Sequence, residues 1–347
     1  MISNKSISIF LAALVLCGAA FGQNKTLREL AQKRGIDVGA AVAVGPLKKE
    51  KLYRQTVERE FTMIVAENAF KWDAVQPARG KFDFRETDYL VEFAAANNLK
   101  LRGHTLVWHR QIPQWLANGR FTRDELVAIL KNHIQTLVGR YRGKISAWDV
   151  VNEAIDDRTG EYRADSFWHK NLGPDYVALA FRFAREADPQ AALYYNDYSA
   201  EGINAKSDGV YRLVAGLKKE NVPIDGVGWQ MHLENGFRIA PEHGANARRL
   251  AALGLEISIT ELDVRAPLPL TPEAAARQAD AYRDVALFCL AETACKAILT
   301  WGLTDRHSWI PKEFPGTGDA LVFDRDYRPK PAYRALAEAL EKGSGRK

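Results

Sequence analysis

Two glutamates next to apolar segments are the strongest candidates for chemistry in this sequence. Glu261 and Asp263 belong to residues 257–264, whose alternating branched apolar side chains predict a buried strand with both carboxylates near its C-terminal end. Glu153 ends a second segment of similar composition, residues 146–153. Carboxylates at the ends of strands can converge in space, and such a pair is the usual arrangement for hydrolysing a glycosidic bond. We therefore pair Glu153 with Glu261.

The two carboxylates would have different tasks. Glu153 would protonate the leaving oxygen, and the adjacent Asn152 amide would hold a sugar hydroxyl beside the reacting carbon. Glu261 must stay ionised to attack, which requires hydrogen-bond donors. Asp263 could orient the imidazole of His232, which in turn would steady the attacking carboxylate. Each residue also has a structural interpretation: a salt-bridged glutamate at a strand end, a satisfied core histidine, or an aspartate that caps a helix.

The elements that must position these groups alternate along the chain. Short branched segments predict eight strands, at residues 38–42, 63–66, 99–108, 146–151, 192–195, 226–231, 255–259 and 297–301. Helices are predicted between most of them, most clearly at residues 123–141, where apolar positions recur at three- and four-residue spacing behind a capping box of Thr122 and Glu125. Another begins after Thr271 and runs to about Cys289. Eight strand–helix units in one domain predict an α/β fold, a single (β/α)8 TIM barrel.

Polar and aromatic residues cluster at the predicted strand ends, where such a barrel places its chemistry. The strand starts show no comparable cluster. The polar positions are Glu67 and Asn68, residues 104–109, Asn152 and Glu153, Asn196 and Asp197, Gln230 and His232, Glu261 and Asp263, and residues 301–305. Aromatic rings there could stack on sugar faces, although they could also be core residues. These aromatic residues are Trp72, Trp108, Tyr198, Trp229, Trp301 and Trp309.

The N-terminus predicts export. Residues 1–22 have a positively charged start, an apolar segment at residues 7–16 and a small-x-small cleavage site at residues 20–22, as in a secretory signal peptide. The remaining residues 23–347 contain no linker and no short-period repeat, so we expect one catalytic domain. We therefore expect a protein that is secreted, to a periplasm or outside the cell, after the signal peptide is removed.

Charge and cysteine usage exclude several classes of protein. A formal net charge of +5 is mild for 347 residues, and the basic residues are scattered, so nucleic-acid binding is not favoured. After residue 22 no apolar segment reaches the roughly 20 residues that span a bilayer, and Leu16 before Cys17 argues against a lipid anchor. Signal removal leaves Cys289 and Cys295, for which export favours a disulfide over two free thiols. Zinc-type spacing and nucleotide-binding motifs are absent, so we expect no metal and no cofactor.

Six motifs, in order along the chain, resemble those of glycoside hydrolase family 10, the retaining endo-β-1,4-xylanases. They are ENAFKW at 67–72, RGHTLVWH at 102–109, WDVVNE at 148–153, QMH at 230–232, ITELD at 259–263 and TWGLTD at 300–305. The resemblance runs from about residue 27 to residue 340. It implies hydrolysis of internal β-1,4-xylosidic bonds by double displacement through a covalent glycosyl-enzyme, with xylan and xylo-oligosaccharides as partners. We expect a monomer.

The resemblance also implies a role for each matching residue. Glu153 corresponds to the acid/base, Glu261 to the nucleophile and Asn152 to the ligand of the sugar 2-hydroxyl. His232 and Asp263 correspond to the hydrogen-bond network of the nucleophile. The groups that would hold sugars on the non-reducing side of the cut are Glu67, Asn68, Lys71, His104, Trp108, Gln111, Asn196, Gln230, Trp301 and Trp309. The pair Cys289 and Cys295 matches a disulfide found in many members.

Two alternative functions remain. The same barrel and glutamates could act on a β-1,4-glucan, whose sugars carry an additional hydroxymethyl group; Lys71, Gln111 and Trp309 would form the wall that rejects it. Rates on aryl cellobioside and aryl xylobioside separate these two substrates. The barrel could also be an inactive carbohydrate-binding or inhibitor protein, but a binding protein has no need for both carboxylates. Release of reducing ends from xylan discriminates this third function.

Overall fold

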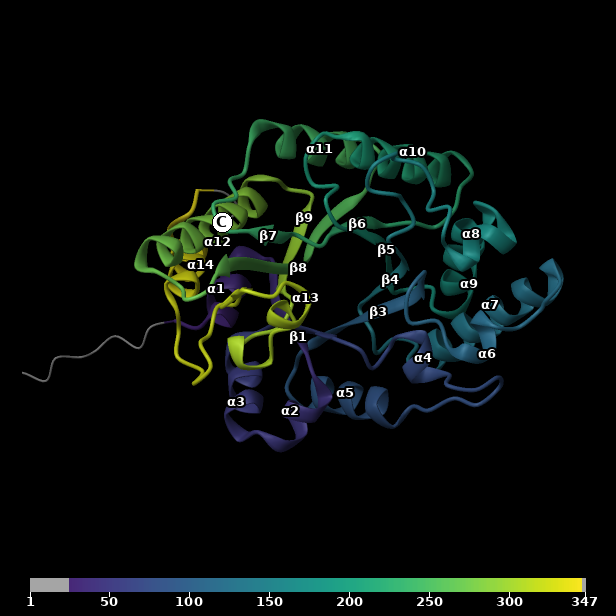
Figure 1. Cartoon of the computed structure of the whole chain (residues 1–347), viewed down its shortest axis with the longest axis horizontal. Coiled ribbons are helices and arrows are strands. Elements are labelled where there is room, and N and C mark those ends of the chain that lie inside the picture. The colour runs from purple at the N-terminus through teal and green to yellow at the C-terminus, as the bar shows by residue number, and fades with distance from the viewer. Residues whose placement is uncertain (1–24, 345–347) are drawn as a thin grey trace, which may run out of the picture.

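A closed ring of eight parallel strands forms the centre of the protein (Figure 1). The computed structural model describes residues 25–344, so the predicted signal peptide lies outside the described residues. The ring consists of β1 (Asp37–Val42), β2 (Met63–Ala66), β3 (Lys100–Trp108), β4 (Ala147–Asn152), β5 (Ala192–Asp197), β6 (Gly226–Trp229), β8 (Glu256–Pro267) and β9 (Cys295–Thr300). Strand β9 pairs with both β8 and β1, which closes the ring. The predicted (β/α)8 barrel is confirmed.

Helices surround the ring on its outer side (Figure 1). The capping box predicted from Thr122 and Glu125 is present at the start of α7, and Thr271 caps α12. No helix of residues 25–344 has both the length and the apolar composition needed to cross a bilayer. The helices are α1 (Leu27–Arg34), α2 (Val44–Lys49), α3 (Lys51–Glu60), α4 (Trp72–Val75), α5 (Arg85–Ala96), α6 (Gln114–Ala117), α7 (Arg123–Arg140), α8 (Phe167–Leu172), α9 (Asp175–Ala187), α10 (Ala205–Lys219), α11 (Pro241–Ala251), α12 (Pro272–Ala291), α13 (Ile310–Glu313), α14 (Pro331–Lys342) and the 3-10 helix η1 (Asp305–His307).

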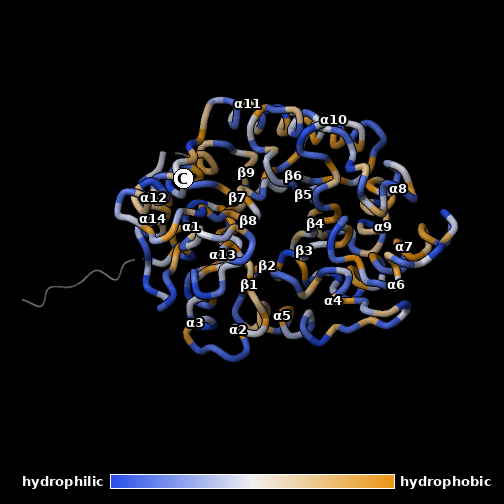
Figure 2. The backbone as a smooth tube through the Cα atoms, viewed as in Figure 1, coloured by the Kyte–Doolittle hydropathy of each residue, from blue (hydrophilic) through white to orange (hydrophobic). Residues whose placement is uncertain are grey.

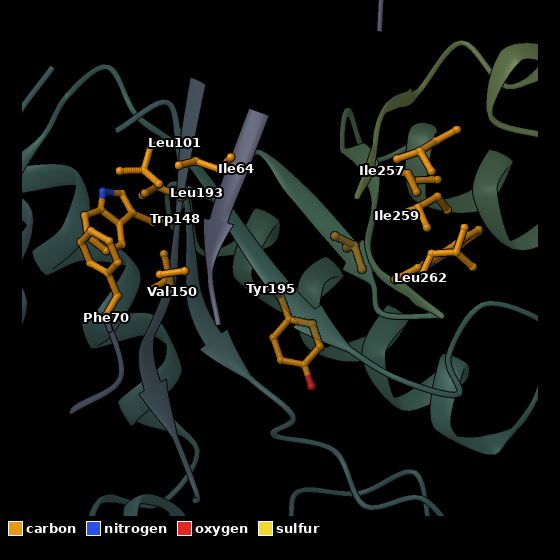
Figure 3. Close-up of a cluster of buried hydrophobic side chains, with 14 of the residues drawn as sticks. Ile64, Phe70, Leu101, Trp148, Val150, Leu193, Tyr195, Ile257, Ile259 and Leu262 are labelled. Atoms are coloured by element: carbon orange, nitrogen blue, oxygen red, sulfur yellow. The ribbon is translucent and has the colours of Figure 1, made fainter. Parts of the chain in front are cut away.

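Successive residues of a strand point in opposite directions, so each strand has one face toward the helices and one toward the inside of the ring. Both faces are buried. One face packs against the helices in a large apolar core. Figure 3 shows part of this core on two sides of the ring, with Trp148, Val150, Ile64 and Leu101 on one side and Ile257, Ile259 and Leu262 on the other. The other face contributes a small separate cluster inside the ring, namely Ala41, Met63, Val65, Ala297, Leu299 and Trp301. Hydrophilic residues are most frequent in the outer loops (Figure 2).

Strand β8 is longer than its sequence pattern predicted. It continues to Pro267, so Glu261 and Asp263 lie within the strand and not near its end. Two short strands that were not predicted pair with this extension: β7 (His232–Glu234) runs parallel to it and β10 (Thr317–Gly318) antiparallel. Strand β7 pairs with residues 263–265 of β8, which places His232 opposite Asp263 and lengthens the sheet beyond the ring.

A disulfide joins Cys289 near the end of α12 to Cys295 at the start of β9, as predicted. The bridge closes the short connection between the last helix–strand pair of the ring. Both residues are buried, and the two strands beside β9 are β1 and β8. The disulfide thus restrains the connection next to the strand that carries Glu261.

Candidate active site

A cavity of about 400 Å³ lies at the C-terminal ends of the barrel strands and contains both glutamates. It is the place to which the sequence assigned the chemistry. Of the predicted site residues, those that line it are Lys71, His104, Trp108, Asn152, Glu153, Gln230, His232, Glu261, Trp301 and Trp309. Its other lining residues are Arg110, Tyr198, Ser199, Arg265, Glu313 and Phe314. The volume is in the range typical of small-molecule sites, and polar groups converge on it.

Two amide side chains connect the glutamates. Asn152 Nδ2 donates to Glu153 Oε1 over 3.1 Å, and Asn196 Nδ2 lies 2.7 Å from Glu261 Oε1. The same Asn196 nitrogen lies 2.8 Å from Asn152 Oδ1, so the chain of bonds runs from one carboxylate to the other. Thr260 Oγ1 donates to Asn196 Oδ1 over 2.7 Å, which turns the amide nitrogen toward Glu261. The structure thus brings together two carboxylates that are far apart in the sequence.

Glu153 is held from both its side chain and its backbone. Trp108 Nε1 donates to its Oε2 over 2.9 Å, and Gln230 Nε2 donates to its Oε1 over 3.0 Å. Its backbone is left-handed, with φ 57°, a conformation that is costly for a residue with a Cβ atom. Two bonds maintain it: the Glu153 N–H donates to Asn196 O over 2.9 Å, and Arg163 Nε donates to Glu153 O over 3.2 Å. Such strain is typical of functional sites.

Glu261 faces an imidazole that is itself held by a second carboxylate. His232 Nε2 lies 3.1 Å from Glu261 Oε2, and His232 Nδ1 lies 3.0 Å from Asp263 Oδ2. Burial alone would lower the pKa of His232, but the two carboxylates outweigh it and raise the pKa to about 10. At neutral pH the ring is therefore an imidazolium that donates from both nitrogens. Trp309 Nε1 also donates to Asp263 Oδ2, over 2.8 Å.

The imidazolium in turn keeps Glu261 ionised. Burial alone would raise the pKa of the Glu261 carboxyl, since it opposes the charged form. The hydrogen bond from His232 and the nearby imidazoles of His104 and His232 outweigh burial, so the pKa of Glu261 is lowered. A buried carboxylate that stays charged and faces a cavity is suited to nucleophilic attack.

The charge on His232 predicts a pH-dependent contribution to stability. Its pKa is about 10 in the folded protein against 6.5 for a free imidazole, so its contribution is fully present below about pH 6.5 and is lost as the pH rises through about 10. We expect the difference in free energy of unfolding between the parent and a His232→Asn variant to shrink over this window. Urea unfolding of both proteins at several pH values measures it; a difference that does not change with pH would contradict the assignment of charge.

A buried ion pair inside the barrel supports the nucleophile from the other side. Arg102 Nη2 lies 2.5 Å from Asp149 Oδ1, and His104 Nδ1 lies 3.0 Å from Asp149 Oδ2. Burial alone would raise the pKa of Asp149, but Arg102 and His104 outweigh it and lower the pKa. His104 Nδ1 is also 3.9 Å from Glu261 Oε1. Arg102 and Asp149 were not predicted as site residues, although both stand within quoted motifs.

The predicted sugar-binding residues separate into two groups. Lys71 lines the cavity, lies 5.0 Å from the centre of the Trp108 ring and donates to Asn68 Oδ1 over 3.0 Å. Burial lowers the pKa of Lys71, although nearby carboxylates, Glu261 foremost, oppose the shift. Four predicted ligands do not line the cavity, namely Glu67, Asn68, Gln111 and Asn196. Of these, Asn196 still contacts the site, because its side-chain nitrogen donates to Asn152 Oδ1 and Glu261 Oε1.

Two of the aromatic residues considered for sugar stacking are core residues. Trp72 stacks on His133 with ring centres 3.6 Å apart and also on Trp168. Trp229 is fully buried and stacks on Phe288 of α12, on the helix side of the barrel. The core interpretation is therefore correct for these two. A tryptophan at a strand end can point into the barrel or toward the surrounding helices, and the sequence pattern does not distinguish these two directions.

The remaining cavity residues lie outside the quoted motifs, in the last part of β8, in α13 and in loops. Arg265, Glu313 and Phe314 were not considered in the sequence, and neither were Arg110 and Ser199. Arg265 stacks over the Phe314 ring at 4.2 Å, so the β8 extension and the loop after β9 meet at the cavity wall. Arg110 follows directly after a quoted motif, which was the one available signal for it.

Comparison with known proteins agrees with this geometry. The model of the family described as "Glycosyl hydrolase family 10" matches residues 26–339. Endo-1,4-beta-xylanase B of Thermotoga neapolitana is 42% identical over 341 residues, which are 97% of this chain and 98% of that protein. The structure of native xylanase 10B from Thermotoga maritima superposes with a TM-score of 0.89 at 45% identity, covering 91% of this chain and 98% of that one. Xylanase 10B from Thermotoga petrophila RKU-1 in complex with xylobiose gives the same score and identity over 92% and 98%.

Proposed function

The chain belongs to glycosyl hydrolase family 10, and on that premise we propose that Glu261 and Glu153 carry out its reaction as nucleophile and acid/base. The protein is an endo-1,4-β-xylanase that hydrolyses internal bonds of xylan with retention of configuration. The observation that carries the assignment of roles is the pair of amides, Asn152 and Asn196, that links the two carboxylates across one cavity.

In the first step, Glu261 attacks the anomeric carbon of the bound xylosyl unit. A bond forms between a Glu261 oxygen and that carbon while the glycosidic bond breaks, and Glu153 transfers its proton to the leaving oxygen. His232 and Asn196 keep the nucleophile charged and oriented until attack. Trp108 and Gln230 fix the acid/base on the opposite side of the site.

In the second step, water hydrolyses the glycosyl-enzyme. Glu153, now a carboxylate, accepts a proton from the water as the water oxygen bonds to the anomeric carbon, and the bond to Glu261 breaks. Both residues thereby return to their initial protonation states. Asn152 donates to Glu153 over 3.1 Å, and we assign to its amide the sugar 2-hydroxyl as a ligand.

Xylan and xylo-oligosaccharides are the proposed ligands of the cavity. A relative with 45% identity has been solved in complex with xylobiose. Trp301 and Trp309 offer aromatic surfaces to sugar rings, while Lys71 and Gln230 offer donors to hydroxyl groups. Asn196 and His104 complete this set at the nucleophile, and Glu67, Asn68 and Gln111 stay proposed as outer sugar ligands.

We further propose that the protein is exported as a monomer without a membrane anchor. The support is the sequence of residues 1–22, which predicts a cleaved signal peptide, together with the disulfide between Cys289 and Cys295. Residues 23–347 would then form the mature catalytic domain. N-terminal sequencing of the secreted protein tests the cleavage site after residue 22.

The stereochemical outcome tests the roles of the two carboxylates together. We expect the first product of xylobioside hydrolysis to have the β configuration of the substrate, because two displacements at the same carbon restore it. Proton NMR in the first minutes, before the sugar mutarotates, distinguishes the two anomers. An initial α anomer would mean a single displacement by water and would contradict Glu261 as a nucleophile.

A further inference from the structure

The turn that leads from β6 into the first residue of β7, residues 230–232, reaches both catalytic glutamates. Gln230 Nε2 donates to Glu153 Oε1 over 3.0 Å, and His232 Nε2 lies 3.1 Å from Glu261 Oε2. One short segment thus supplies a donor to the proposed acid/base and another to the proposed nucleophile. A displacement of this turn would disturb both carboxylates at once.

The backbone of the same turn pairs with the strand that carries the nucleophile. The Glu261 N–H donates to Gln230 O over 3.0 Å, and the Asp263 N–H donates to Met231 O over 3.4 Å. The carbonyl groups of Gln230 and Met231 therefore accept their hydrogen bonds from β8. Met231 itself is buried with φ 55°, the left-handed conformation that side chains rarely adopt. Some other group must hold the turn in this shape.

That group is the carboxylate of Glu201. The Met231 N–H donates to Glu201 Oε1 over 3.1 Å. Glu201 belongs to the loop between β5 and α10, and Asn246 anchors this loop by donating to Ala200 O over 2.8 Å and to Glu201 O over 2.9 Å. Tyr198 and Ser199 of the same loop line the cavity. The contact therefore ties a wall of the cavity to the turn that orients the catalytic groups.

A glutamate at position 201 lowers the stability of the fold unless its carboxyl group has a function, because that group is buried. It is 7% exposed, and among residues 25–344 it forms no ion pair. Burial raises the pKa of its carboxyl. Burying a carboxyl group costs stability, so the hydrogen bond that Glu201 accepts from the Met231 N–H calls for an explanation in function.

We propose that Glu201 is a positioning residue that holds the 230–232 turn, and through it the side chains of Gln230 and His232, against the two catalytic glutamates. The inference rests on the proposed function, because it assigns a role in the reaction of that same site. Glu201 does not touch the reacting atoms. Its effect is on the geometry of both donors, so it should influence both steps of the double displacement.

The test compares three variants with the parent on aryl xylobiosides. Glu201→Ala removes the acceptor for the Met231 N–H, whereas Glu201→Gln keeps an oxygen in the same place. Glu60→Ala is a matched control: Glu60 is also buried and accepts a backbone N–H, from Leu27 over 3.2 Å, but it lies on α3 away from the cavity. Thermal unfolding of each variant is measured beside kcat and KM.

We expect kcat of Glu201→Ala to fall by about 100-fold with a much smaller change in KM, since misplacement of catalytic groups by about 1 Å has an effect of that size. Glu201→Gln should recover most of this loss, and Glu60→Ala should lower the melting temperature while kcat stays near the parent value. The loss in Glu201→Ala should persist for substrates with good leaving groups, because the nucleophile is displaced together with the acid/base. If the alanine variant does not fold, Glu201→Asp, which is too short to reach Met231, should show the same slow turnover.

Two results would overturn the inference: a kcat of the folded Glu201→Ala or Glu201→Asp variant that equals that of Glu60→Ala, or a glutamine variant as slow as the alanine variant. Either would reduce Glu201 to a residue that contributes to stability alone. Failure of the proposed function looks different, because the parent protein itself would then release no reducing ends from xylan.

Discussion

Replacement of Glu261 by alanine is expected to abolish the hydrolysis of xylan and of aryl xylobiosides alike. Without the carboxylate, no glycosyl-enzyme can form, and a better leaving group does not replace the missing nucleophile. Loss of a nucleophile that works within a tightly coupled site typically lowers kcat by roughly 10⁵-fold or more. Reducing-end assays on xylan and release of the aryl group from a xylobioside both measure the loss.

A second acidic residue on the same strand provides the control for this variant. Glu256 is the first residue of β8, where it accepts a hydrogen bond from Tyr194 over 2.8 Å, and it does not line the cavity. Glu256→Ala removes a carboxylate from the same element and should leave kcat near the parent value. Cleavage of xylan by Glu261→Ala at a rate close to that of Glu256→Ala would end the assignment of Glu261 as the nucleophile.

The barrel was predictable because each of its strands carries a short branched apolar segment between turn residues. Segment β2, residues 63–66, has the predicted bounds, and α7 starts where its capping box indicates. These signals are local, since they depend on side-chain alternation and on hydrogen bonds within one turn of the helix. The extension of β8 beyond residue 264 was missed because its partners, β7 and β10, come from loops whose two or three paired residues leave no periodic pattern.

The candidate site was predictable only where chemistry restricts the residue type. Glu153 and Glu261 stand out because a carboxylate after a buried strand is costly unless it is used. The amide bridge between Asn152 and Asn196 joins strands β4 and β5, and no property of either segment alone indicates which atoms meet. The same holds for Arg265 and Phe314, whose contact depends on how the C-terminal part of β8 meets the segment after α13. Trp72 and Trp229 were considered for sugar stacking but are core residues. Their position near a strand end does not indicate whether the side chain points into the cavity or into the core.

Glu153→Ala should have a different kinetic signature from Glu261→Ala, because an acid is needed only when the leaving group is poor. Hydrolysis of xylan, whose leaving group is a sugar hydroxyl, should fall by roughly 10³-fold, in the range of general acid–base catalysis. For an aryl xylobioside with a strongly acidic phenol, the first step should stay fast. Water then attacks without a base, so the glycosyl-enzyme on Glu261 should accumulate and give a burst of phenol followed by slow turnover.

The accumulated intermediate offers a direct discrimination between the two glutamates. A small anionic nucleophile such as azide needs no base and can enter the space that the Glu153 side chain leaves, next to Trp108 and Gln230. Azide should therefore accelerate Glu153→Ala on the activated substrate and give a β-xylobiosyl azide, because attack on the covalent intermediate inverts the carbon a second time. In Glu261→Ala no intermediate forms, so any azide product would arise by a single displacement and carry the α configuration. A β-azide from Glu261→Ala together with an α-azide from Glu153→Ala would require the roles of the two residues to be exchanged, and no azide product from Glu153→Ala would contradict Glu153 as the acid/base.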